Sequence, residues 1–75
     1  MSEKINIYVG DLEFISKYKD SFSLRTKEDL LECLKFKKDA TFHSMYVEEV
    51  ISLFYRFGLT EKEISNFNFI TENEE

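Results

Sequence analysis

Residues 41–59 read TFHSMYVEEVISLFYRFGL, and this stretch is apolar around most of a helical circumference. One narrow polar stripe runs along it, formed by residues four apart and widened by Glu49: Ser44, Glu48, Ser52 and Arg56. A helix with so narrow a polar face is surrounded by other protein on most sides. We therefore predict a central helix over residues 41–57, ended by Gly58 as a C′ glycine.

The N-terminal third allows two interpretations. Apolar residues alternate over residues 4–9 and predict a strand. Gly10 and Asp11 suit a two-residue hairpin turn, which would lay a second, antiparallel strand beside the first. Alternatively, Asp11 is the N-cap of a short helix over residues 12–19, followed by a parallel strand at residues 22–24. We favour the hairpin, and leave open whether residues 12–19 form a strand or a helix.

Two further helices have clear start signals. Thr26 precedes an acidic residue by three positions, as in a capping box, and Thr60 with Glu63 forms a proper one. The predicted fold class is α+β: a small antiparallel N-terminal hairpin or three-stranded sheet packed on two to three helices. We expect residues 1–71 to form a single compact domain and residues 72–75 to form a frayed acidic tail.

Charge and composition limit the partners and the compartment. The chain has 75 residues and a net charge of −5, and residues 39–75 carry eight acidic but only two basic side chains. Such a surface repels a phosphate backbone, so nucleic acid is an unlikely partner and a basic protein a suitable one. A single cysteine, the lack of a signal-peptide pattern and the lack of a long apolar stretch predict a cytoplasmic protein without membrane contact.

The sequence contains no recognisable catalytic set. It has one histidine, His43, and one cysteine, Cys33, whereas zinc sites need several such ligands at set spacings. Glu48 and Glu49 are adjacent, so on a helix they diverge rather than oppose each other as acid–base pairs do. We expect no enzyme activity, no catalytic residues, no cofactor and no metal.

Function by contact is the remaining hypothesis. Eight phenylalanines and four tyrosines exceed what so small a core can hide. The candidate partner-binding residues are the accessible aromatics and the acidic groups of the C-terminal half: Tyr46, Glu48, Glu49, Tyr55, Glu61 and Glu63. We predict a small intracellular protein-binding regulator or inhibitor of a larger partner. One concrete version is a phage or mobile-element protein directed at a nucleic-acid enzyme. The alternatives are a helix-turn-helix-like nucleic-acid-binding protein, in which residues 50–67 supply the motif, and a self-associating structural protein that forms a homodimer.

Overall fold

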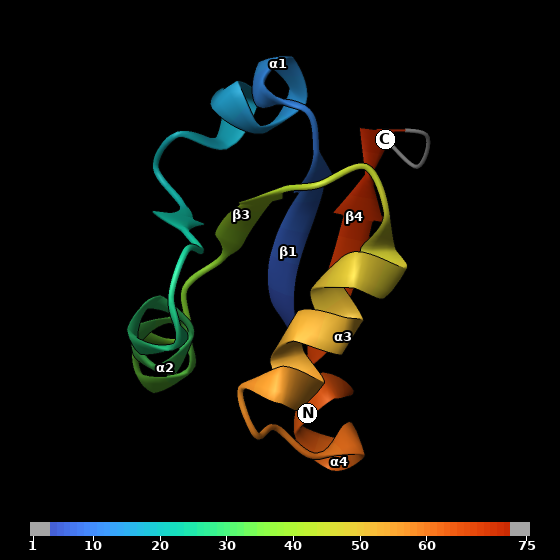
Figure 1. The fold of residues 1–75 in the computed structure, drawn as a ribbon. Helices are drawn as coiled ribbons and strands as arrows, with labels where there is room; N and C mark the ends of the chain where they lie inside the picture. Colours follow the sequence, from blue (N-terminus) through green and yellow to red (C-terminus); the bar gives the residue numbers. More distant parts are fainter. Residues whose placement is uncertain (1–3, 73–75) are drawn as a thin grey trace.

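Strands and helices alternate along the chain in the structure, a computed structural model that describes residues 4–72 (Figure 1). The strands are β1 (Ile5–Gly10), β2 (Phe22–Ser23), β3 (Ala40–His43) and β4 (Phe67–Thr71). The helices are α1 (Leu12–Ile15), which continues as the 3-10 turn η1 (Ser16–Tyr18), α2 (Lys27–Phe36), α3 (Val47–Arg56) and α4 (Glu61–Ile64).

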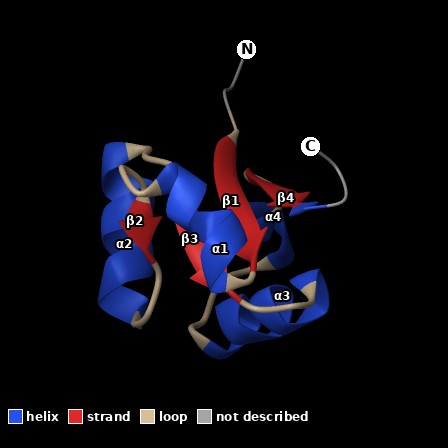
Figure 2. Ribbon diagram, turned by 90° about the horizontal axis from the view of Figure 1, so that it is seen from above, coloured by secondary structure: helices blue, strands red, loops and turns tan. Residues whose placement is uncertain are grey.

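The four strands form one sheet in the order β2-β3-β1-β4, and every neighbouring pair is parallel. The predicted antiparallel hairpin or sheet is therefore wrong. Parallel strands need crossover connections, which α1 with η1, α2, and α3 with α4 supply. Seen from above, α3 lies along one side of the row of strands and α2 lies beside β2 (Figure 2). The chain leaves β1 towards β2 and leaves β3 towards β4, so the carboxyl ends of β1 and β3 form a topological switch point.

The hairpin prediction fails at Gly10 and Asp11. Asp11 is the N-cap of α1, and its Oδ1 accepts a hydrogen bond from the Phe14 backbone N–H at 2.8 Å. Gly10 is the last residue of β1, and a Cβ there would lie 2.4 Å from Cδ2 of Phe14. The glycine therefore serves the close approach of a ring rather than a tight turn. The alternative interpretation, a capped short helix followed by a parallel strand, matches the structure.

The predicted helix over residues 41–57 is also too long at its N-terminal end. Residues 40–43 form β3, which pairs with β1 on one side and β2 on the other, and α3 begins only at Val47. Thr41 and Phe42 are β-branched and aromatic residues, which suit a strand between two neighbours. The stripe that includes Ser44 therefore extends beyond the helix, because Ser44 lies in the β3–α3 loop.

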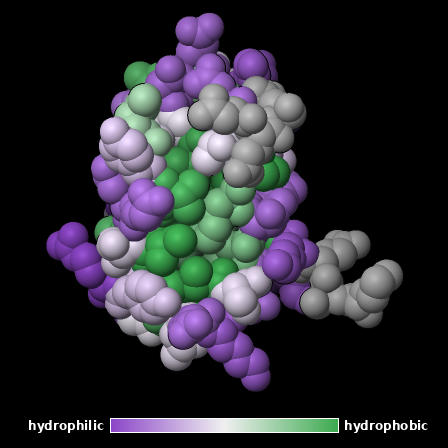
Figure 3. Space-filling model, turned by 90° about the vertical axis from the view of Figure 1, so that its right-hand side faces the viewer, coloured by the Kyte–Doolittle hydropathy of each residue, from purple (hydrophilic) through white to green (hydrophobic). Residues whose placement is uncertain are grey.

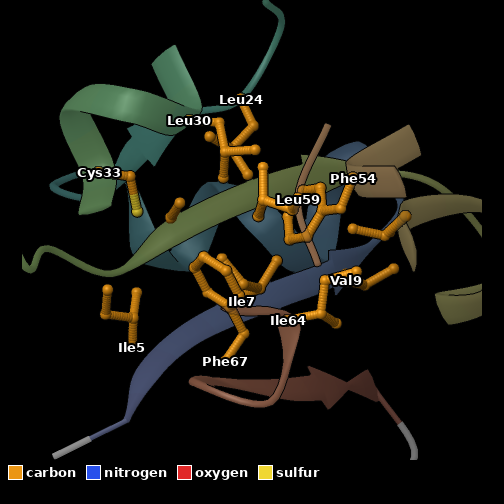
Figure 4. Close-up of a cluster of buried hydrophobic side chains, with 12 residues drawn as sticks. Ile5, Ile7, Val9, Leu24, Leu30, Cys33, Phe54, Leu59, Ile64 and Phe67 are labelled. Carbon is orange, nitrogen blue, oxygen red and sulfur yellow. The ribbon is translucent and has the colours of Figure 1, made fainter. Parts of the chain in front are cut away.

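The core lies on one face of the sheet. Alternate residues of β1 point into it, and α2, α3 and α4 cover it, so that twelve buried side chains form one cluster, most of them labelled in Figure 4: Ile5, Ile7, Val9, Leu24, Leu30, Cys33, Ala40, Val50, Phe54, Leu59, Ile64 and Phe67. On α3, Val50 and Phe54 are fully buried, whereas Leu53 is only half-buried. The helix is thus less enclosed than its composition predicts.

The opposite face of the sheet is polar and only partly covered. The ring of Tyr18 stacks on the ring of Tyr8 with centroids 3.7 Å apart and planes 4° apart. Towards the amino ends of the strands, Asn6 accepts a hydrogen bond from the side chain of Asn68 at 3.2 Å, and Asp39 accepts one from the Asn6 backbone N–H at 3.0 Å. Because only one face of the sheet is fully covered, apolar and polar residues alternate along β1, although most parallel strands are apolar on both faces.

The two predicted capping boxes and the predicted glycine at the end of the central helix are confirmed. Thr26 and Thr60 form capping boxes with Asp29 and Glu63 respectively. Gly58, just after α3, has a φ of +99°, the conformation expected of a C′ glycine. Beyond the last helix, β4 returns the chain to the core.

Candidate functional site

The polar stripe of α3 forms one wall of a surface groove. The groove has a volume of about 410 Å³ and is lined by Phe42, Glu48, Glu49, Ser52, Leu53 and Arg56. The helical residues among them form two neighbouring rows at four-residue spacing, one from Glu48 to Arg56 through Ser52 and one from Glu49 to Leu53. Phe42 comes from β3, and with Leu53 it gives the groove an apolar lining. The groove is therefore an open site whose lining combines two apolar side chains with three charged ones.

The acidic end of the groove, formed by Glu48 and Glu49, is hydrogen-bonded to the loop between β3 and α3. Ser44 is buried there, and its hydroxyl accepts a hydrogen bond from the Tyr46 backbone N–H at 3.2 Å. The same hydroxyl donates to Oε2 of Glu49 at 3.3 Å. Tyr46 is the N-cap of α3 but makes no side-chain capping bond, so the carboxylates of Glu48 and Glu49 carry the favourable interaction with the positive helix end.

The charges of the groove are separated along the helix. Within residues 4–72, neither Glu48 nor Arg56 forms an ion pair, and both are exposed. Eight residues of α-helix separate them, which corresponds to about 12 Å of rise. The groove is thus negative at the N-terminal end of α3 and positive at the C-terminal end.

The predicted partner-binding residues fall into three places. Tyr46, Glu48 and Glu49 come together at the N-terminal end of α3, and 61% of Tyr46 is exposed. Tyr55 is 49% exposed but belongs to the other flank of α3, in line with Ile51. Sequence reasoning placed Ser52 and Arg56 in the polar stripe without making them candidates.

Glu61 and Glu63 lie beyond the C-terminal end of α3. Glu63 is already engaged, because its Oε1 accepts the Thr60 backbone N–H at 2.9 Å. The helix they belong to, α4, has four residues. A single helical turn in which Glu61 and Glu63 flank the only basic residue gives no support to nucleic-acid binding through this segment.

Sequence reasoning missed Phe42 and the apolar groups near the switch point. The sequence pattern places Phe42 in the central helix, whereas its pairing in β3 brings it into the groove beside α3. Leu12 comes shortly after the carboxyl end of β1, and Met45 and Tyr46 come shortly after that of β3. Leu12 and Met45 are 64% and 72% exposed. The only signal for these groups in the sequence is the alternative interpretation of Asp11 as an N-cap, which implies a helix directly after the first strand.

Cys33 and His43, whose side chains could serve catalysis or metal binding, do not line the groove. Burial, aided by the nearby negative charge of Asp39, raises the pKa of the Cys33 thiol to about 11, so the reactive thiolate is suppressed. His43 is exposed at the end of β3. Among residues 4–72, no three histidine, cysteine, aspartate or glutamate side chains are placed to hold a metal ion. None of the helices in that range has the length and apolarity of a membrane span.

Comparison of the chain with protein-family models, with curated proteins and with solved structures finds no match.

Proposed function

We propose that this protein acts by contact, as a small regulator or inhibitor that binds a larger protein through the groove on α3. The observation that carries the proposal is that apolar and charged side chains line the same groove. Phe42 and Leu53 line the groove, while Glu48 at its side forms no ion pair within residues 4–72. Ionised side chains next to apolar surface are suited to bind a complementary charged residue and exclude water around it.

The polarity of the groove specifies the kind of partner. A lysine or arginine of the partner would lie against Glu48 and Glu49, with its apolar stem or an apolar neighbour over Phe42. A carboxylate of the partner would lie near Arg56, about 12 Å further along α3. The net charge of −5 would steer a basic partner towards the protein. A nucleic-acid enzyme fits this description, because its phosphate-contacting surface is basic.

The test is affinity capture from a native lysate, followed by measurement of the purified pair. The double variant Glu48→Lys, Glu49→Lys reverses the charge of the acidic end at exposed positions. We expect it to weaken the captured complex at least about tenfold, as reversal of complementary charges does. The affinity of the wild-type complex should also fall as salt concentration rises.

The matched control is Glu28→Lys, Glu32→Lys. These residues are exposed on α2, and Glu28 lies in the first turn of its helix as Glu48 does in α3. The control should bind the same partner with unchanged affinity. Equal weakening by both double variants would show that only net charge matters. A complex that is indifferent to both would place the binding surface elsewhere. Either result overturns the proposal.

A further inference from the structure

The outer edge of β4 is unpaired. β4 ends the sheet, with β1 as its only neighbour among the described strands. The Ile5 N–H donates to the carbonyl of Asn66 at 3.0 Å, so the backbone groups of residue 66 face β1. Because successive residues of a strand direct their backbone groups to alternate sides, Asn68 and Ile70 also face β1. The N–H and C=O groups of Phe67, Phe69 and Thr71 therefore point outwards.

Within residues 4–72, this edge lacks the charge, the proline and the covering strand that usually protect an edge strand. β4 is five residues long, whereas β2 at the other edge has two. Its sequence, FNFIT, contains no charge, and the chain contains no proline. Natural sheets normally protect long edges with lysine, proline, bulges or covering segments. An uncharged edge of this length is suited to pair with another strand.

An apolar surface lies next to the edge. Viewed from the β4 side, a continuous hydrophobic area runs between α3 and the sheet, framed by polar residues (Figure 3). The partly buried side chains that border the core there include Val47 and Ile51 from α3 and Phe69 from β4. Val47, Ile51 and the exposed Tyr55 follow each other at four-residue spacing, so they form one strip along the helix.

We propose that β4 pairs with β4 of a second copy of this chain, antiparallel and with Phe69 opposite Phe69 of the other copy. In this register every outward N–H and C=O of Phe67, Phe69 and Thr71 meets a complementary group, because residues 67 and 71 are then opposite each other. The two-fold axis is perpendicular to the sheet, so the pairing is isologous and closes at a dimer. Residues 64–71 are uncharged, so the two paired segments would not repel each other.

The apolar strip gives the contact its area. Pairing of two five-residue strands is small beside the roughly 1,000 Å² of total buried surface that a stable interface needs. The two-fold axis places both α3 helices on the same side of the extended sheet, where the strips of Val47, Ile51 and Tyr55 face each other. Strand pairing supplies the register, and burial of the strips supplies most of the stability.

Hydrogen exchange of individual amides tests the register directly. On raising the protein concentration into the dimeric range, the amides of Phe67, Phe69 and Thr71 should exchange at least tenfold more slowly. The amides of Asn68 and Ile70, which already bond to β1, should change far less. Uniform slowing of all five, or no slowing, contradicts the proposed pairing.

Sedimentation velocity tests the dimer and its surface. The wild type should sediment as a dimer with a dissociation constant that two variants raise at least tenfold. Thr71→Pro removes an outward N–H without removing a bond to β1, and Tyr55→Lys adds charge to the strip. The control Leu31→Lys, on α2 and 47% exposed, should leave dimerisation unchanged. Circular dichroism verifies that each variant is folded. A wild type that is monomeric at about 1 mM, or a dimer that both variants leave intact, overturns the proposal.

The dimer and the groove on α3 are separable. Glu49 is two residues from both Val47 and Ile51, which places it on the opposite side of α3 from these two residues, so Glu49→Lys alone should leave dimerisation intact, whereas Glu48, three residues before Ile51, borders the strip. Thr71→Pro should in turn leave capture of the partner through the groove intact. Failure of one proposal is thus distinguishable from failure of the other.

Discussion

The ring of Phe14 occupies the space in which a side chain at residue 10 would begin: a Cβ on Gly10 would lie 2.4 Å from Cδ2 of Phe14. Phe14 is 2% exposed and belongs to α1, which follows β1 after a single residue. This contact fixes α1 against the carboxyl end of the central strand.

Substitution of Gly10 by alanine should therefore destabilise the fold by about 1–3 kcal/mol, the usual cost of overpacking. Urea denaturation measures the loss. Gly58→Ala is the comparison: apart from residue 58 and its chain neighbours, nothing lies within 4 Å of the Cβ position, so only the φ of +99° opposes a side chain, at a cost of about 1 kcal/mol. In a Phe14→Ala background, the further cost of Gly10→Ala should fall to near zero, a coupling that a double-mutant cycle detects. An undiminished cost there contradicts the steric explanation.

Lys37→Gly should stabilise the protein by about 0.5–1 kcal/mol. Lys37 is the C-cap of α2 and, within residues 4–72, the only non-glycine residue with a positive φ, at 52°. Glycine adopts this left-handed conformation without a Cβ clash. The control Lys35→Gly, inside α2, should instead cost about 1 kcal/mol. Thermal or urea unfolding that gives both variants the same sign would be inconsistent with this assignment.

Asp29→Asn should lower stability at neutral pH, and the deficit should shrink in acid. Backbone N–H groups of Arg25 and Thr26 donate to the Asp29 carboxylate at 3.0 and 3.1 Å, and they hold the pKa of this carboxyl below its ordinary value. A lowered pKa stabilises the fold above the unfolded-state pKa of about 3.9, and this stabilisation is lost as pH falls through the folded-state pKa. Urea midpoints of both proteins at pH 7 and at pH 2–3 measure the effect. A stability deficit that is constant with pH would show that ionisation of Asp29 does not stabilise the fold.

Cys33 should resist thiol reagents in the native protein. Its Sγ–H donates to the carbonyl of Lys38 at 2.8 Å, and burial raises the pKa of the thiol from 9.0 to about 11. The thiolate fraction at neutral pH is then about 100-fold below that of an ordinary cysteine, which slows alkylation correspondingly. Labelling in urea should restore the ordinary rate, so the reaction also reports unfolding. Rapid stoichiometric labelling without denaturant would show that Cys33 is accessible.

The sequence by itself determined the features that a few neighbouring residues decide. The capping boxes at Thr26 and Thr60, the glycine after α3 and the polar stripe from Glu48 to Arg56 were all predicted and are all present. Each depends on hydrogen bonds or side-chain spacings within one or two helical turns. For the same reason, the sequence alone marks Glu48 and Glu49 as candidates.

Only the tertiary structure decided the direction of the strands and the boundary between β3 and α3. Alternation in β1 is compatible with both an antiparallel hairpin and a parallel strand whose second face is partly polar, and Gly10 suits either a turn or the approach of Phe14. Residues 40–43 form a strand because β1 and β2 supply hydrogen-bonding partners on both sides. That pairing places Phe42 in the groove beside Leu53. Such contacts join segments far apart in the chain, so no local pattern specifies them.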